Sequence, residues 1–249
     1  MDKIEYLIKK SKQVRRDLLK LAIESNNGHI ASAFSTVEII VALYEEFLKE
    51  EDRFILSKGH ACLSLYTILR YKGLNPKISI HPDIEREQGI ECTTGSLGHG
   101  LPIGVGMAFA KKFKNEKGKV FVLIGDGECQ EGTTWESLNL AKRFKLDNLV
   151  VIVDNNKLQA LDTIKNIMWE TDLKGKFEVF GCDVAEINGH NFEELINSFD
   201  ANNIKINMPR VIIAHTIKGK GVSFMENVAC WHSRIPEGKL LEQAYKELE

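Results

Sequence analysis

The stretch FVLIGDGECQEG, residues 121–132, decides the fold. Its first five residues are apolar and predict a strand that is buried on both faces, as is typical of parallel sheets. Gly125, Asp126 and Gly127 follow this strand directly, and a helix is predicted to begin a few residues later. Glycines at such a turn let backbone N–H groups approach a phosphate, but an aspartate between them would repel it. A cation between Asp126 and the ligand would resolve this conflict.

Apolar strands alternate with helices along the rest of the chain. Strands are predicted over 53–57, 119–125, 148–154 and 210–216, with VAEING at 184–189 after an irregular stretch. Helices are predicted over 1–25, 39–48, 60–73, 100–114, 133–145, 191–202 and 239–249. The alternation predicts an α/β fold, a doubly wound parallel sheet with helices on both faces, in a single domain over residues 1–249.

Two further local patterns refine this expectation. Ser35-Thr36-Val37-Glu38 has the form of a capping box, which predicts the start of the helix at 39–48. Residues 74–95 have no clean hydrophobic period and contain several turn residues, so they are predicted to be a long loop. Long loops in compact domains often carry function.

The composition excludes several classes of protein. Hydrophobic residues make up 43% of the 249 residues and the formal net charge is −2, so no nucleic-acid surface is expected. The five cysteines are scattered without a C-x-x-C pair, which argues against a zinc cage and a disulfide framework and favours a cytoplasmic location. Charges are spread through the first 25 residues, so no secretory or membrane segment is expected.

Asp126 and Asn156 are candidate metal ligands. Each follows a buried strand, and they are about thirty residues apart in one strand-helix-strand unit. If the two strands are neighbours, both side chains project from the same edge of the sheet. Their oxygens suit a hard cation such as Mg²⁺, which often completes its coordination shell with phosphate oxygens and water.

GDG followed by NN at this interval resembles the thiamin diphosphate motif. Four further segments resemble transketolase in particular, at 26–39, 57–66, 81–108 and 214–236. The resemblance implies that Mg²⁺, with Ca²⁺ or Mn²⁺ as possible substitutes, is held by Asp126, Asn156 and the backbone carbonyl of Leu158. It also implies transfer of a two-carbon ketol unit from a ketose to an aldose, with thiamin diphosphate as the electron sink.

The resemblance also assigns roles to individual residues. The catalytic set would be His29, His60, His81, His232 and Glu131, the last at an interface with another subunit. Histidines suit this chemistry because their pKa lies near the working pH. The residues that bind the cofactor would be His60, Gly95, Leu97, Gly98, Gly125, Asp126, Gly127, Glu128, Asn156, Gln159 and His232.

Several positions depart from the family pattern or have a simple structural explanation. His99 stands where the family usually has glutamine, and LQALDT at 158–163 lacks the usual glycine, which puts contacts of Gln159 and Asp162 in doubt. An acid such as Glu131 in the first turn of a helix is also favoured by the helix dipole. Lys218 and Lys220 could steer anions, but they are interpreted as loop lysines that face solvent.

The resemblance covers only the N-terminal part of a full-length transketolase. It implies that the chain is the N-terminal subunit of a split enzyme that binds sugar or sugar-phosphate substrates. Its partner would be a separate C-terminal subunit with the pyrimidine-binding and C-terminal domains, and the expected assembly is a dimer of heterodimers. Neither nucleic acid nor membrane is expected as a partner.

Three alternatives remain open from the sequence. The chain could belong to another thiamin diphosphate carboligase, such as one like deoxyxylulose phosphate synthase or a transketolase for an unusual sugar. It could be a non-catalytic regulatory subunit that binds the cofactor. A plain nucleotide-binding fold is disfavoured because the chain has neither G-x-x-x-x-G-K-[ST] nor a G-x-G-x-x-G after a first strand.

Overall fold

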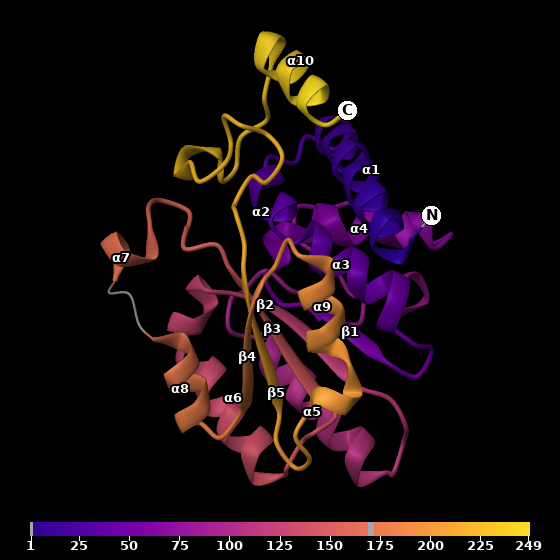
Figure 1. Cartoon of the computed structure of the whole chain (residues 1–249), viewed down its shortest axis with the longest axis vertical. Coiled ribbons are helices and arrows are strands. Elements are labelled where there is room, and N and C mark those ends of the chain that lie inside the picture. The colour runs from indigo at the N-terminus through magenta and orange to yellow at the C-terminus, as the bar shows by residue number, and fades with distance from the viewer. Residues whose placement is uncertain (1, 169–171) are drawn as a thin grey trace.

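A five-stranded parallel sheet forms the centre of the molecule (Figure 1). The structure is a computed structural model and describes residues 2–168 and 172–249. The strand order is β1-β2-β3-β5-β4 and every neighbouring pair is parallel. The strands are β1 (Arg53–Leu56), β2 (Val120–Gly125), β3 (Leu149–Asn155), β4 (Asp183–Asn188) and β5 (Arg210–His215). The prediction of a parallel α/β fold is therefore confirmed.

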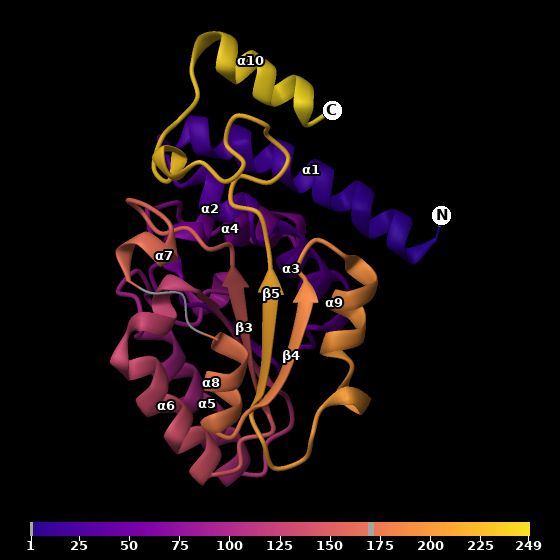
Figure 2. The same cartoon turned by 60° about the vertical axis from the view of Figure 1, so that its left-hand side comes forward.

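Helices pack on both faces of this sheet. Figure 2 shows α5, α6 and α8 on one face and α9 on the other, while α1, α2 and α4 lie toward the carboxyl ends of the strands. The α-helices are α1 (Lys3–Glu24), α2 (Ile30–Phe34), α3 (Val37–Ala42), α4 (Cys62–Tyr71), α5 (Gly100–Phe113), α6 (Gly132–Arg143), α7 (Ile164–Ile167), α8 (Leu173–Val179), α9 (Phe192–Phe199) and α10 (Gly238–Glu247). Shorter helical turns are η1 (Leu43–Phe47), η2 (Gly59–Ala61), η3 (Arg86–Gln88), η4 (Gly127–Gln130), η5 (Ala201–Asn203) and η6 (Ala229–Trp231).

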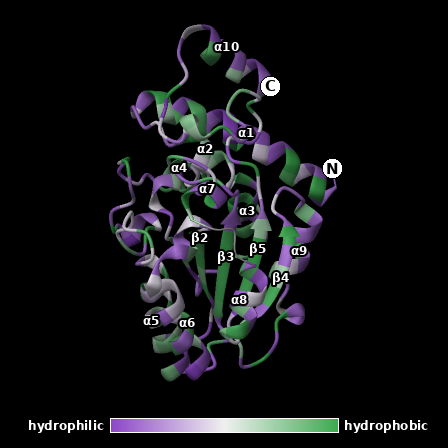
Figure 3. Ribbon diagram, turned by 90° about the vertical axis from the view of Figure 1, so that its left-hand side faces the viewer, coloured by the Kyte–Doolittle hydropathy of each residue, from purple (hydrophilic) through white to green (hydrophobic). Residues whose placement is uncertain are grey.

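Because the strands carry apolar residues on both faces of the sheet, helices have to cover both faces. Successive residues of a strand point to opposite faces, so Phe121 and Leu123 join the core with α1, α3, α4 and α9. Val122 and Ile124 join a second core with α5, α6 and α8. The central strands β2, β3 and β5 are accordingly coloured mainly as hydrophobic in Figure 3.

The register of the sheet places the two sequence motifs at one edge. Gly125 pairs with Asp154 across β2 and β3, and the backbone N–H of Asp126 donates to the carbonyl of Asp154 at 3.2 Å. The GDG loop and the loop that follows Asn155 are therefore direct neighbours. Ligand sites in parallel sheets lie beyond the carboxyl ends of the strands.

The structure corrects two local predictions. Ser35 and Glu38 do not form a capping box, because Ser35 Oγ donates to Asp154 and Glu38 pairs with Arg15. The irregular stretch after β3 contains two short helices, α7 and α8, which the sequence pattern missed. Part of that stretch, at 169–171, lies outside the described residues.

Within 2–168 and 172–249, no helix combines the length and the apolar character that crossing a membrane requires.

Candidate active site

A cavity of about 300 Å³ lies at the carboxyl edge of the sheet. Its walls come from the start of α2, the loop after β1, the long loop 74–95, the GDG loop, the loop after β3 and the loop after β5. The lining residues are His29, Ser32, Lys58, His60, His81, Gly95, Leu97, Gly125, Asp126, Gly127, Glu128, Gln130, Glu131, Asn156, Leu158, Gln159, Ala160, Lys218 and His232.

Every site residue predicted from the sequence lines this cavity except Gly98. Gly98 lies just behind the wall, where its N–H donates to Glu128 at 2.8 Å and its carbonyl accepts from Thr133 at 2.7 Å. Its φ of 81° favours glycine, and a Cβ would lie 2.7 Å from Cβ of Glu131. Gly98 therefore does not face the cavity, but it holds the loop before α5 against Glu128 and Thr133.

Four histidines from four separate segments gather in the cavity. The ring centroid of His29 lies 5.9 Å from that of His60, 6.0 Å from His81 and 5.4 Å from His232. The rings of His60 and His232 are 5.3 Å apart. Such a cluster offers several hydrogen-bond groups to a hydroxylated substrate.

Glycines, which have no side chain, let these segments approach each other closely. A Cβ on Gly28, next to His29, would lie 2.6 Å from the carbonyl carbon and oxygen of Ser233. Gly95 has a φ of 131°, and a Cβ there would lie 2.9 Å from the ring of His81. The glycines of these loops therefore have a packing role at the cavity.

Burial keeps three of the histidines neutral. It lowers the pKa of His29, assisted by the charges of His81 and Lys218. Burial and the nearby charge of Lys58 hold the pKa of His60 well below its usual value. Burial and the charge of Lys218 lower the pKa of His232 to about 3. Each of these rings can both donate and accept hydrogen bonds at neutral pH.

Asp126 is a buried carboxylate, only 6% exposed, whose oxygens accept from backbone N–H groups. One oxygen accepts from Gly127 N–H at 2.8 Å and the other from Lys157 N–H. Burial and the charge of Asp154 raise the pKa of Asp126 to about 6. A cation beside Asp126 would remove this penalty.

The surrounding oxygens fit a divalent cation that also binds a ligand. In the described part of the chain no cluster of three or more His, Cys, Asp or Glu side chains could hold a metal by itself. A cation here would use Asp126, the side-chain oxygen of Asn156, the carbonyl of Leu158 and oxygens of the ligand. The Asn156 side chain is held for this role, because its amide group donates to Asp154 at 3.1 Å and its oxygen accepts from Leu158 N–H at 3.0 Å. This donor set matches the preference of Mg²⁺.

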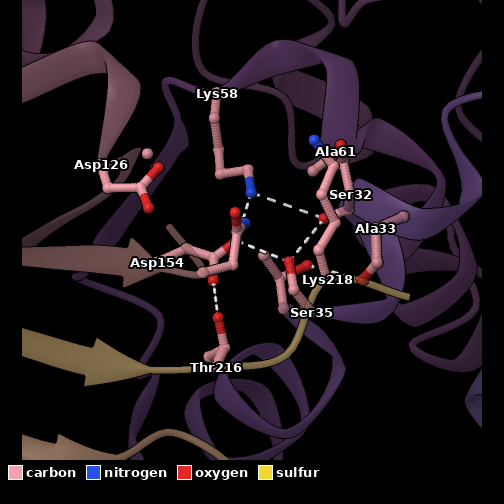
Figure 4. Close-up of polar contacts among 12 residues, drawn as sticks. Ser32, Ala33, Ser35, Lys58, Ala61, Asp126, Asp154, Thr216 and Lys218 are labelled. Carbon is pink, nitrogen blue, oxygen red and sulfur yellow. Dashed lines mark hydrogen bonds and ion pairs between the residues drawn. The ribbon is translucent and has the colours of Figure 1, made fainter. Parts of the chain in front are cut away.

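Asp154 and Lys58 form a buried ion pair beneath the cavity, which the sequence reasoning missed (Figure 4). The Lys58 ammonium also lies 3.5 Å from the carbonyl of Ser32, and Asp154 accepts from Ser35 Oγ at 2.6 Å and from Thr216 Oγ1. Burial by itself would raise the pKa of Asp154. The charge of Lys58 and these hydrogen bonds lower the pKa by more than burial raises it, so the net shift is downward. This ion pair joins segments from four parts of the chain.

Lys218 corrects another prediction. The sequence predicts that it faces solvent, but it is only 1% exposed. Its ammonium donates to the carbonyl of Gln159 at 3.0 Å and lies 3.4 Å from the carbonyl of Leu158 and 2.8 Å from Nδ1 of His232. Burial and the charge of Lys58 lower the pKa of Lys218 to about 8. Lys220, in contrast, pairs with Glu226 nearer the surface.

Both missed lysines share a sequence signal. Lys58 lies two positions beyond the end of β1 and precedes a glycine, and Lys218 lies just beyond β5 and also precedes a glycine. A lysine before a glycine, just beyond the carboxyl end of a parallel strand, is placed where anionic ligands bind.

Two predicted acids play different parts. Glu128 is fully buried, and its carboxylate accepts from Gly98 N–H at 2.8 Å, Gly125 N–H at 3.2 Å and Ser57 Oγ. It therefore braces the loops around the cavity. Glu131 is exposed and is the N-cap of α6 without a side-chain capping bond, a position at which the helix dipole favours an acid.

The structure also shows where Gln159, Asp162 and His99 lie, the residues at the departures from the family pattern. Gln159 lines the cavity and donates to the Gln130 side chain at 2.7 Å. Asp162 is outside the lining and bonds to Thr163 and Asn166. His99 is exposed at the start of α5, where Nδ1 contacts Ser96 and Leu97.

The arrangement combines features that a diphosphate ester needs. Two buried ammonium groups, the turn at Gly127 and the oxygens around Asp126 line the same cavity as the histidine cluster. The first group suits a diphosphate with a divalent cation, and the second suits a hydroxylated substrate.

Comparison with known proteins agrees with this geometry. Residues 9–236 match the family "Transketolase, thiamine diphosphate binding domain". One of the subunits of apulose-4-phosphate transketolase from Phocaeicola vulgatus is 37% identical, over 98% of this chain and 94% of that protein. The 6-deoxy-6-sulfo-D-fructose transketolase subunit SqwG of a Clostridium species is 34% identical, over 89% of this chain and 88% of that protein.

One-chain transketolases are similar to this chain over part of their length. Human transketolase is 30% identical over 99% of this chain but only 42% of its own. The crystal structure of Campylobacter jejuni transketolase superposes with a TM-score of 0.85 and 28% identity, over 98% of this chain and 43% of that one. The chain belongs to the transketolase family and carries its thiamine diphosphate-binding domain.

Proposed function

We propose that this chain is the thiamin diphosphate-binding subunit of a two-chain transketolase, active only with a C-terminal partner subunit. The single observation that carries the proposal is the cavity that joins Asp126 and Asn156 to four clustered histidines. A histidine cluster beside the cofactor site supports sugar chemistry over a purely regulatory binding role. The subunit names of relatives that match this chain over most of their own length support a separate partner.

The cofactor would supply an electron sink for breaking and forming the carbon–carbon bond of a ketol. Asp126, Asn156 and the Leu158 carbonyl would hold Mg²⁺, for which Ca²⁺ or Mn²⁺ could substitute. Lys218, His60 and the Gly127 N–H would bind the diphosphate, and Leu97 would pack against the aminopyrimidine ring. Gly95, Gly98, Gly125, Glu128 and Gln159 would shape and hold the surrounding loops.

The clustered histidines would act on the sugar. His29 and His81 would bind the carbonyl and first hydroxyl groups of the donor, and His60 and His232 would hold or move a proton at the reacting oxygen. Their low pKa values keep His29, His60 and His232 uncharged, so each can act as donor and acceptor without a repelling charge near Lys218. The substrate would be a sugar or sugar phosphate.

A hydrophobic surface supports the partner part of the proposal. We call Ile103, Phe109, Phe113, Leu140 and Phe144 the α5–α6 apolar face. All five are exposed, and Phe109 lies 4.6 Å from Phe144 and 6.0 Å from Phe113 between ring centroids. An exposed aromatic cluster of this kind is typical of an interface. Ile103 lies in the first turn of α5, near Leu97, whereas Phe113 and Phe144 lie at the carboxyl ends of α5 and α6, away from the cavity.

The same proposal places the enzyme in the cytoplasm, as a dimer of heterodimers. The five cysteines are free thiols and four of them are buried, which suits a reducing compartment.

Reconstitution tests the proposal. The chain is mixed with the protein that co-purifies with it, thiamin diphosphate and MgCl₂, and ketol transfer is measured with a panel of ketose and ketose-phosphate donors. We expect turnover by the mixture and none by either chain alone. Turnover by the purified chain alone would refute the need for a partner, and a mixture that neither binds the cofactor nor turns over would refute the enzyme assignment.

A further inference from the structure

A buried network of Arg15, Glu38 and His190 lies outside the cavity, and the proposed chemistry does not use it. Arg15 is 5% exposed and Glu38 6% exposed. The guanidinium of Arg15 donates to the two carboxylate oxygens of Glu38 at 2.6 and 2.5 Å. Nδ1 of His190 lies 2.9 Å from the same carboxylate. The network joins α1, α3 and the turn between β4 and α9.

The hydrogen bonds define the state of His190. The backbone N–H of Ile217 donates to Nε2 of His190 at 2.8 Å. Nε2 is therefore unprotonated, and Nδ1 carries the proton that is donated to Glu38. The ionised carboxylate of Glu38 holds this tautomer, and Arg15 holds the carboxylate.

The same network forms hydrogen bonds with the backbone of the loop after β5 at two points. Ile217 is bound through its N–H to His190, and the carbonyl of Lys220 accepts from Nε of Arg15 at 3.0 Å. Lys218 lies between these two points, and its buried ammonium reaches His232 and the carbonyl of Gln159. Fixing the backbone on both sides of Lys218 fixes where its ammonium enters the cavity.

Arg15 also reaches the first segment of the cavity. Its second terminal nitrogen lies 3.2 Å from the carbonyl of Phe34, the last residue of α2. His29 is the N-cap of that helix, and Ser32 within it accepts from Lys58. One side chain therefore connects the segment of His29 with the loop of Lys218.

We propose that Arg15, Glu38 and His190 are positioning residues that set the place of Lys218 and His232 in the cavity. The part of the inference that concerns the cofactor rests on the proposed function. The part that concerns the loop does not, because it follows from the contacts to Ile217 and Lys220 alone. A buried hydrogen-bond network whose members are all satisfied rigidifies the segments that it joins.

Hydrogen–deuterium exchange on the full chain without cofactor tests the loop directly. In His190→Ala the Ile217 N–H loses its acceptor, so amides in 217–221 should exchange about fivefold to tenfold faster. Peptides from β3 and β5 should keep their rates, which shows that the fold is intact. The matched control is His215→Ala, because His215 is exposed at the end of β5 and its ring bonds to the Asn155 and Glu186 side chains.

A conservative variant separates hydrogen bonding from packing. His190→Gln keeps a carbonyl acceptor and an amide donor on one side chain. Its loop should therefore exchange more slowly than that of His190→Ala. Equal exchange in the two variants would overturn the role of His190 as acceptor, and unchanged exchange in His190→Ala would overturn the positioning role altogether.

Titration calorimetry with inorganic pyrophosphate and MgCl₂ tests the consequence for the cavity. Binding to His190→Ala should be about tenfold weaker than to the unsubstituted chain, and binding to His215→Ala unchanged. Faster loop exchange without weaker pyrophosphate binding would refute the link to Lys218. Absence of pyrophosphate binding by the unsubstituted chain would contradict the proposed function instead, and the exchange rates would still decide the role of the network.

Discussion

The ammonium of Lys218 lies 2.8 Å from Nδ1 of His232 inside the cavity. With a pKa of about 8 for Lys218 and about 3 for His232, the lysine is the charged partner at neutral pH. Nδ1 of His232 is therefore the acceptor, and the ring proton is on Nε2. Lys218 thus fixes the tautomer of His232 and supplies positive charge to the same space.

Replacing Lys218 should weaken cofactor binding. Lys218→Met removes a buried positive charge, and we expect the dissociation constant for thiamin diphosphate with Mg²⁺ to rise by about tenfold to a hundredfold. Lys220→Met is the matched control, since Lys220 is in the same loop but pairs with Glu226. Calorimetry on the reconstituted complex measures both, and equal affinities for the two variants would show that Lys218 does not bind the diphosphate.

Asp126 should control the metal requirement. Asp126→Ala removes the buried carboxylate, so adding thiamin diphosphate with MgCl₂ should no longer raise the melting temperature of the complex. Asp162→Ala removes an acid from the neighbouring loop that does not line the cavity and should retain the full shift. A normal Mg²⁺-dependent shift in Asp126→Ala would argue against the metal site.

The Asp154–Lys58 ion pair should be needed for stability. Asp154→Asn leaves the Lys58 ammonium buried without its counter-charge, and we expect the free energy of unfolding to fall by about 3–5 kcal/mol. Adding Lys58→Met to this variant should recover part of the loss. Chemical denaturation measures both, and a double variant no more stable than the single one would show that the unpaired charge is not the cause.

Because of Glu38, the free energy of unfolding should depend on pH in the acid range. Burial raises its pKa, but Arg15 and His190 lower it more, from 4.5 to about 2. A carboxylate with a lowered pKa stabilises the fold above its unfolded pKa, and this contribution is lost as the pH falls from about 4.5 to 2. The shift corresponds to about 3 kcal/mol. The difference in unfolding free energy between the unsubstituted chain and Glu38→Gln should shrink over this range, and a constant difference would exclude the ionised network.

The α5–α6 apolar face should be needed for assembly. Phe113 is 78% exposed at the end of α5, and Phe113→Lys should weaken the complex with the partner subunit by about tenfold or more, because it places a charge in the interface. Val179→Lys is the control, since Val179 is 86% exposed on α8. Analytical ultracentrifugation of mixed subunits measures the effect, and equal association of both variants would place the interface elsewhere.

Much of the fold and of the site follows from local sequence patterns. Continuous apolar strands predict a parallel sheet, and the loops after two such strands place Asp126 and Asn156 at one edge because neighbouring parallel strands end together. Family resemblance supplied the four histidines, which come from segments too far apart in sequence to be related by spacing.

The sequence predictions that were wrong, for the capping box and for Lys218, have a common physical cause. Ser35 and Glu38 have the right spacing for a capping box, but distant partners, Asp154 and Arg15, bind them instead. Lys218 has the composition of a solvent-facing loop residue, but it is buried against the loop after β3. Tertiary contacts of this kind override local preferences and leave no periodic signal.

The close approach of Gly28 to Ser233 has a consequence for biosynthesis. These residues touch next to the cavity-lining His29 and His232 but are about 200 residues apart in the chain. At typical rates of synthesis, roughly 10 to 40 s separate the appearance of the first segment from that of the last. During this time the apolar residues around α2 lack their final cover, and exposed apolar surface of this kind makes an incomplete chain prone to aggregation.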